Sequence, residues 1–231
     1  MAKVFKSNFC LIFVLLFALN LTKAQGDDNV AWLSPISLST EIKKDWIASL
    51  APILRLDEDF SGYQNFSLDY TIKKKIDANW SFEVLGRTWF LPDGTNRQFL
   101  WPAISYSHKV KDVAWSHRVR WHQAFDIEDR TDPDFIRYFQ SLKYTAWGKL
   151  QPFIGLELWW GLNGTLQIER LRYIPGLQYK INEKLSVTVA LWRQESLNLD
   201  PEMEVNLWRF NLAYKLPPLW KKSEESLKGN L

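Results

Sequence analysis

Residues 113–126, VAWSHRVRWHQAFD, decide the fold of this chain. Two sets of side chains alternate along them. Val113, Trp115, Val119, Trp121 and Phe125 fall on one parity, and Ser116, Arg118, Arg120, His122 and Asp126 fall on the other. Successive side chains of a β-strand point to opposite faces. The stretch therefore predicts a strand with one apolar, aromatic face and one charged face.

The same alternation recurs from Ala31 to Leu216 in segments separated by short polar turns. We expect strands at Trp32–Glu41, Trp46–Asp57, Tyr63–Lys73, Trp80–Leu91, Phe99–Val110, Val113–Asp126, Phe135–Trp147, Pro152–Leu162, Glu169–Ile181, Leu185–Glu195 and Val205–Leu216. The apolar faces are too aromatic for water, and the opposite faces are too charged for a soluble core. A membrane barrel with lipid outside and a polar lumen satisfies both. The expected fold is all-β, a transmembrane up-and-down antiparallel β-barrel.

The number of strands is less clear than their positions. Eleven segments can be drawn, whereas bacterial single-chain barrels normally have an even number of strands. We therefore expect 10 or 12 strands, with either a further strand near residues 25–33 or one segment outside the wall. Turn lengths alternate, so the turns at Lys43–Asp45, Lys111–Asp112, Gly148–Lys149 and Asn182–Lys184 are expected in the periplasm and the longer loops outside.

The first 24 residues have the three parts of a secretory signal peptide. Lys3 and Lys6 precede the apolar run Leu11–Leu19, and Ala24 ends a small-residue cleavage site. The run is too short for a membrane-spanning helix, which needs about 20 apolar residues. We expect a cleaved signal peptide at 1–24, an outer-membrane β-barrel at 25–216, and a polar C-terminal tail at 217–231 that begins at Pro217.

The charge balance and the cysteine content limit which partners and metal sites the chain can have. Residues 1–24 hold three lysines and no acid, so residues 25–231 carry 26 basic and 26 acidic side chains and have no net charge. This balance does not favour a nucleic-acid partner. The one cysteine, Cys10, lies inside the signal peptide, so we expect no disulfide and no thiolate metal site in the rest of the chain. With 13 Trp, 8 Tyr and 14 Phe, the chain can supply the aromatic girdles of a membrane barrel.

The polar faces of the strands are the candidate site. The predicted lumen network consists of Arg55, Glu83, Arg87, Arg118, Arg120, His122, Arg137, Glu157, Arg170, Arg172 and Arg209. In a barrel of this size side chains largely fill the interior, and buried charges must be paired. The network is therefore interpreted as a structural filling of the lumen. Because basic groups outnumber acidic ones, a narrow conduit for small anionic solutes is the alternative.

Two other classes of function stay open at this point. A lipid-modifying outer-membrane enzyme, a hydrolase or acyltransferase, would place a serine beside a histidine. The histidines are His108, His117 and His122, and no ordered catalytic motif accompanies them, so no catalytic residue is assigned. A soluble exported barrel that binds an apolar ligand would instead turn its apolar parity inward. No metal or cofactor is predicted, because the histidines are scattered.

Three motifs resemble those of bacterial outer-membrane β-barrels catalogued as domain of unknown function 2490. They are H-R-x-R at His117–Arg120, P-F-x-x-x-E at Pro152–Glu157, and R-x-R-x-x-x-G-x-x-Y-K at Arg170–Lys180. The likeness spans residues 30 to 216. It implies a porin-like barrel of unassigned activity in the outer membrane of a Gram-negative bacterium, with outer-membrane lipid and the barrel-assembly machinery as partners. It carries over no catalytic residue.

Overall fold

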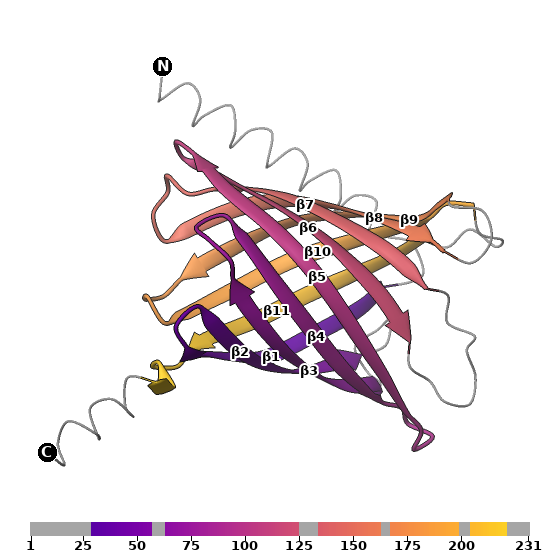
Figure 1. The fold of residues 1–231 in the computed structure, drawn as a ribbon. Coiled ribbons are helices and arrows are strands. Elements are labelled where there is room, and N and C mark those ends of the chain that lie inside the picture. The colour runs from indigo at the N-terminus through magenta and orange to yellow at the C-terminus, as the bar shows by residue number, and fades with distance from the viewer. Residues whose placement is uncertain (1–28, 57–62, 125–133, 163–166, 199–203, 221–231) are drawn as a thin grey trace, which may run out of the picture.

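The structure is a closed barrel of eleven strands. The computed structural model describes residues 29–56, 63–124, 134–162, 167–198 and 204–220. The strands are β1 (Asn29–Lys43), β2 (Trp46–Leu56), β3 (Tyr63–Lys75), β4 (Trp80–Phe90), β5 (Asn96–Val110), β6 (Val113–Ala124), β7 (Phe135–Tyr144), β8 (Leu150–Gly161), β9 (Gln167–Lys180), β10 (Leu185–Ser196) and β11 (Glu204–Lys215). Each strand pairs with the next along the chain, and β1 pairs with β11 (Figure 1). In the described ranges no helix is long and apolar enough to cross a bilayer.

The closing pair corrects the predicted strand count. The barrel has eleven strands, so the expectation of an even number is wrong. With an odd number the first and last strands run in the same direction, and β1 and β11 therefore pair in parallel while all other pairs are antiparallel. Ser37 lies opposite Ala213, and Ser39 lies opposite Lys215. The ladder continues one residue further, where the Leu216 amide donates to the Ser39 carbonyl at 2.7 Å.

All eleven predicted segments correspond to strands of the barrel. The strands that begin at Trp46, Tyr63, Trp80, Val113 and Phe135 start where the alternation starts. The largest differences are three residues at one end, as in β5, which begins at Asn96, and β7, which ends at Tyr144. The signal peptide at 1–24, most of the loop 127–134 and residues 221–231 of the tail lie outside the described residues.

The two faces of the wall have opposite chemistry. On β6, Val119 and Trp121 are 44% and 46% exposed on the outer surface, whereas Arg120 between them is 6% exposed inside the barrel. Other strands repeat this pattern. Leu50, Tyr70, Ile72, Phe82, Leu100, Ile104, Ile136 and Phe210 are also exposed outside. A soluble barrel with an apolar lumen would have the reverse arrangement, so the structure does not support that alternative.

Side-chain oxygens hold several of the turns between strands. In the turn between β3 and β4, the Asp77 Oδ1 atom accepts hydrogen bonds from the backbone amides of Asn79 and Trp80, both at 2.7 Å. The Asn182 Oδ1 atom does the same for Lys184 and Leu185 between β9 and β10. Such Asx turns satisfy backbone donors that the strand ladders leave without partners.

Glycines inside the barrel lie beneath aromatic rings of the neighbouring strand. A methyl group built on Gly176 of β9 would lie 2.3 Å from the Phe153 ring and 2.9 Å from the Val189 carbonyl oxygen. Gly155 of β8 has the same relation to Phe139, at 2.8 Å. The absence of a side chain at these positions leaves room for each ring against the wall.

Candidate functional site

Glu157 of β8 is the centre of the polar interior. Both of its carboxylate oxygens accept hydrogen bonds from the Arg137 Nη2 atom of β7 at 2.9 Å. The Arg172 Nη1 atom of β9 donates to Oε2 at 2.9 Å, and the Trp159 indole donates to the same oxygen at 3.1 Å. Arg172 also donates to the side-chain oxygen of Gln194 on β10. Four adjacent strands are therefore linked through one buried carboxylate, with charge-assisted hydrogen bonds that are stronger than neutral ones.

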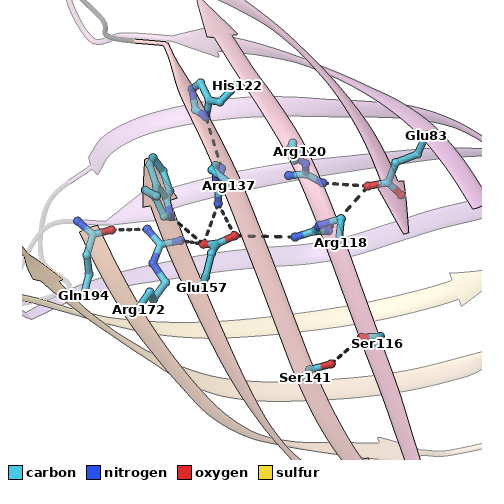
Figure 2. Close-up of polar contacts among 11 residues, drawn as sticks. Glu83, Ser116, Arg118, Arg120, His122, Arg137, Ser141, Glu157, Arg172 and Gln194 are labelled. Carbon is cyan, nitrogen blue, oxygen red and sulfur yellow. Dashed lines mark hydrogen bonds and ion pairs between the residues drawn. The ribbon is translucent and has the colours of Figure 1, made fainter. Parts of the chain in front are cut away.

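A second carboxylate, Glu83 of β4, organises the next part of the wall. The Arg120 Nη2 atom donates to its Oε1 atom at 3.0 Å. Arg118, two residues earlier on β6, lies between the two carboxylates, 3.8 Å from Glu83 and 3.9 Å from Glu157. Figure 2 shows this chain of contacts running from Gln194 to Glu83. Arg118 thus joins the two clusters electrostatically without a hydrogen bond to either carboxylate.

The remaining strands complete a charged layer around the lumen. Arg87 of β4 binds Asp69 of β3 through two hydrogen bonds, with Nη2 and Oδ2 2.7 Å apart. Arg209 of β11 is attracted to Asp69 and repelled by Arg87. Arg55 of β2 is repelled by Arg172 and Arg87. Because these partners are on non-adjacent strands, the charges act on one another across the lumen and not only along the wall.

Aromatic side chains share the interior with the arginines. The Trp101 ring of β5 is 2% exposed, and the His122 ring lies 4.3 Å from it, measured between centroids. The Arg137 guanidinium lies 3.9 Å from the centre of the Trp159 ring. Cations placed over aromatic faces in this way are attracted to the ring quadrupole. Sequence reasoning missed these aromatics because it assigned all large apolar side chains to the lipid face. For Trp159 the sequence did hold a sign of its inward position, because it shares the parity of Glu157.

A cavity of about 480 Å³ lies in the half of the barrel next to the longer loops. Its lining comes from side chains near the strand ends that face those loops. Among the described residues these are Arg55, Arg87, Trp89, Phe99, Trp101, Arg118, Arg120, His122, Phe135, Arg137, Phe139, Glu157, Trp159, Arg170, Arg172, Ile174, Trp192, Gln194, Val205 and Leu207. The lining therefore combines seven arginines with seven Phe and Trp rings and a single carboxylate.

The structure brings the predicted lumen residues together in this region. Nine of the eleven line the cavity, and the other two, Glu83 and Arg209, lie in the charged layer beside it. Glu157 binds Arg137 and Arg172 directly, whereas Arg170 stacks against Trp159 at 5.2 Å. Gln194 and Asp69 belong to the layer as well. The layer is a mixed ion-pair and aromatic cluster rather than a set of separate arginine–glutamate pairs.

The histidines do not form a nucleophile pair with serine. His108 and His117 lie on the outer surface with their rings stacked 6.2 Å apart, and the His117 Nδ1 atom lies 2.8 Å from the Tyr138 hydroxyl. Ser116 faces inward and hydrogen-bonds Ser141 at 2.7 Å. Within the part of the chain that the structure describes, no hydrogen bond joins a serine to a histidine. In the same ranges no three His, Cys, Asp or Glu side chains are grouped to hold a metal ion.

Comparison with protein families shows which family this barrel belongs to. The model of a protein family of unknown function, DUF2490, matches residues 30–201, about three quarters of the chain. The chain belongs to this family. The match covers β1 to β10 and thus includes Glu157 and all its hydrogen-bond partners. No curated protein and no solved structure matches the chain. The DUF2490 barrel therefore has to be interpreted from its own geometry.

Proposed function

We propose that this DUF2490 protein is an outer-membrane barrel whose lumen is closed by its arginine–glutamate layer. The outer surface supports the membrane location, because exposed side chains such as Leu50, Ile72, Ile104 and Val119 form a belt of a kind that water-facing proteins rarely carry. The polar interior fits the same location. A barrel of this kind presents apolar groups to lipid and keeps its charges inside.

The position of Arg118 carries the proposal that the lumen is closed. Its guanidinium bridges the Glu83 and Glu157 clusters, and the layer continues through Arg87 and Asp69 to Arg209 on the opposite wall. Strands β2 to β11 all contribute side chains to this layer. Side chains largely fill small barrels, and here ion pairs such as Arg120–Glu83 also join side chains of strands that are not neighbours. The barrel is therefore a closed structural element rather than an open pore.

Single-channel conductance in a planar bilayer tests the closed lumen. The wild-type protein is expected to be silent, and an Arg118→Ala/Arg120→Ala variant is expected to pass current. A matched control is Arg193→Ala, which removes an arginine from the outward parity of β10 and should stay silent. Steady anion-selective current through the wild type, altered by the double variant, would instead show a conduit and overturn the closed lumen.

Cysteine labelling tests the location and orientation in the membrane. Beyond Cys10 the chain has no cysteine, so a single introduced thiol reports one site. Leu162→Cys lies at the end with the longer loops, and Glu183→Cys lies in a short turn at the other end. A membrane-impermeant maleimide should label Leu162→Cys on intact cells and label Glu183→Cys only after the outer membrane is permeabilised. The reverse pattern would contradict the proposed orientation.

A further inference from the structure

We propose that the cavity on the long-loop side of the charged layer is a binding site for a small organic anion with a flat apolar body. The inference rests on the proposed function, because the charged layer forms the floor of this cavity and an open pore would have no such floor. A volume of about 480 Å³ lies within the range of small-molecule sites. Seven arginines and one glutamate in the described lining make the compartment strongly cationic. Guanidinium groups bind carboxylate, phosphate and sulfonate groups in a bidentate manner.

Arg118 is held less closely by the carboxylates than the arginines beside it, Arg120 and Arg137. Its nearest carboxylate oxygens lie 3.8 and 3.9 Å away, and its side chain is 28% exposed to the lumen. Arg120 and Arg137 bind their carboxylates at 3.0 and 2.9 Å, and each of these side chains is 8% exposed. Since Arg118 makes no hydrogen bond within the described part of the chain, its Nη donors are available to an incoming anion. The arginines around it are already engaged and hold the site in shape.

The aromatic rings indicate the chemistry of the part of the ligand that carries no charge. The Phe139 ring lies under the Arg118 guanidinium at 5.2 Å, and the Trp101 and Trp159 rings lie further along the same cavity. Flat rings beside cations bind molecules that combine an anionic group with an aromatic or other planar apolar part. A bare inorganic anion would use Arg118 and leave these faces without contacts.

Isothermal titration calorimetry on the full-length folded barrel in zwitterionic detergent tests the site, with protein-free micelles as the blank. The probes are 1-naphthalenesulfonate, neutral 1-naphthalenemethanol and sulfate. Saturable binding of one naphthalenesulfonate per barrel is expected, with the neutral analogue and sulfate each at least about tenfold weaker. The absence of saturable binding, or equal binding of the neutral analogue, overturns the anion site. Sulfate binding as tightly as naphthalenesulfonate overturns the role of the rings.

Variants assign the binding to Arg118. Arg118→Ala should weaken naphthalenesulfonate about tenfold or more, and Arg118→Lys should restore part of the loss, since lysine keeps the charge but loses the bidentate geometry. The matched control is Lys143→Gln. Lys143 is an interior cation outside the cavity, bonded to Gln178 at 2.9 Å, and its loss should leave binding unchanged. Equal weakening in Arg118→Ala and Lys143→Gln would show a general charge effect and contradict a site at Arg118.

The conductance and binding measurements distinguish a failure of the ligand site from a failure of the closed lumen. A silent barrel that binds no naphthalenesulfonate would support the closed lumen and contradict the ligand site. A wild-type barrel that conducts would contradict the closed lumen. It would also contradict the ligand inference, whether or not naphthalenesulfonate binds. A heat-dependent shift in gel mobility confirms that each variant is folded before either measurement.

Discussion

The Nη2 atom of Arg137 lies 2.9 Å from each carboxylate oxygen of Glu157. Arg172 donates to the same carboxylate from the other side, so the loss of Glu157 leaves two buried guanidinium groups without their anion. Removal of one partner of a buried ion pair typically costs about 3–5 kcal/mol. Glu157→Ala should reduce the free energy of unfolding of the barrel by this amount, measured by urea titration in lipid vesicles.

Glu183→Ala is the matched control for this prediction. Glu183 is exposed in the turn between β9 and β10. Substitutions at exposed positions usually change stability by no more than about 0.5 kcal/mol, so the control variant should unfold close to the wild-type midpoint. An unchanged midpoint for Glu157→Ala would mean that water solvates the arginines in an open lumen.

The contact between Gly176 and Phe153 leads to a packing prediction. A methyl group at Gly176 would overlap both the Phe153 ring and the backbone oxygen of Val189. Gly176→Ala should therefore destabilise the barrel by about 1–3 kcal/mol, the usual cost of overpacking. Gly155→Ala meets the Phe139 ring at a longer distance and should cost less. The order of the two unfolding midpoints is the measurement, and a reversed order would contradict the register of β8 and β9.

The parallel closure of the barrel can be tested by a disulfide. Ser37 and Ala213 are paired on β1 and β11. Paired residues of neighbouring strands lie at a Cα separation that a disulfide can bridge. The variant Ser37→Cys/Ala213→Cys should form an intramolecular disulfide, visible as a mobility difference between reduced and oxidised gels. Ser37→Cys/Ser186→Cys spans one further strand and should not form one, because two strand spacings exceed the reach of a disulfide. A bridge in the control alone would indicate a different closing register.

The turn at Asp77 predicts a pH-dependent contribution to stability. Hydrogen bonds from the backbone amides of Trp80 and Asn79 lower the pKa of Asp77 below its ordinary value of 3.8. A carboxylate with a lowered folded pKa stabilises the protein above its ordinary pKa and loses this effect as the pH falls through the folded value. Asp77→Ala should therefore lower the unfolding midpoint at pH 7, and the difference from wild type should shrink as the solution is acidified.

Asp77→Asn is the control, because the amide oxygen of Asn182 holds a similar turn in the same protein. This variant keeps an acceptor that does not titrate, so its midpoint should differ little from that of the wild type at pH 7. A difference between wild type and Asp77→Ala that stays constant with pH would show that the carboxylate charge plays no part.

Much of the fold was predictable from the alternation of side chains, and the site was predictable in part. The parity of Arg118 and Arg120 placed them inside the barrel, because a strand turns every second side chain to the same face. The roles of Trp101 and Trp159 were not predictable. The parity that Trp159 shares with Glu157 places it inside the barrel, but parity does not say which guanidinium its ring covers. Gln194 was missed as well, since a single neutral amide gives no pattern.

The sequence by itself determined the strands, their two chemically opposite faces and the set of inward-facing charges, since all three follow from the two-residue period of an extended chain. The tertiary structure alone decided the number of strands in the wall and the parallel pairing of β1 with β11, because closure depends on contacts between segments more than 170 residues apart, as between Ser37 and Ala213. It also decided which arginine binds which carboxylate. Arg172 lies directly opposite Glu157 on β9, and Arg137 lies two residues from the position opposite Glu157 on β7. Arg118 is left between two carboxylates without a hydrogen bond to either.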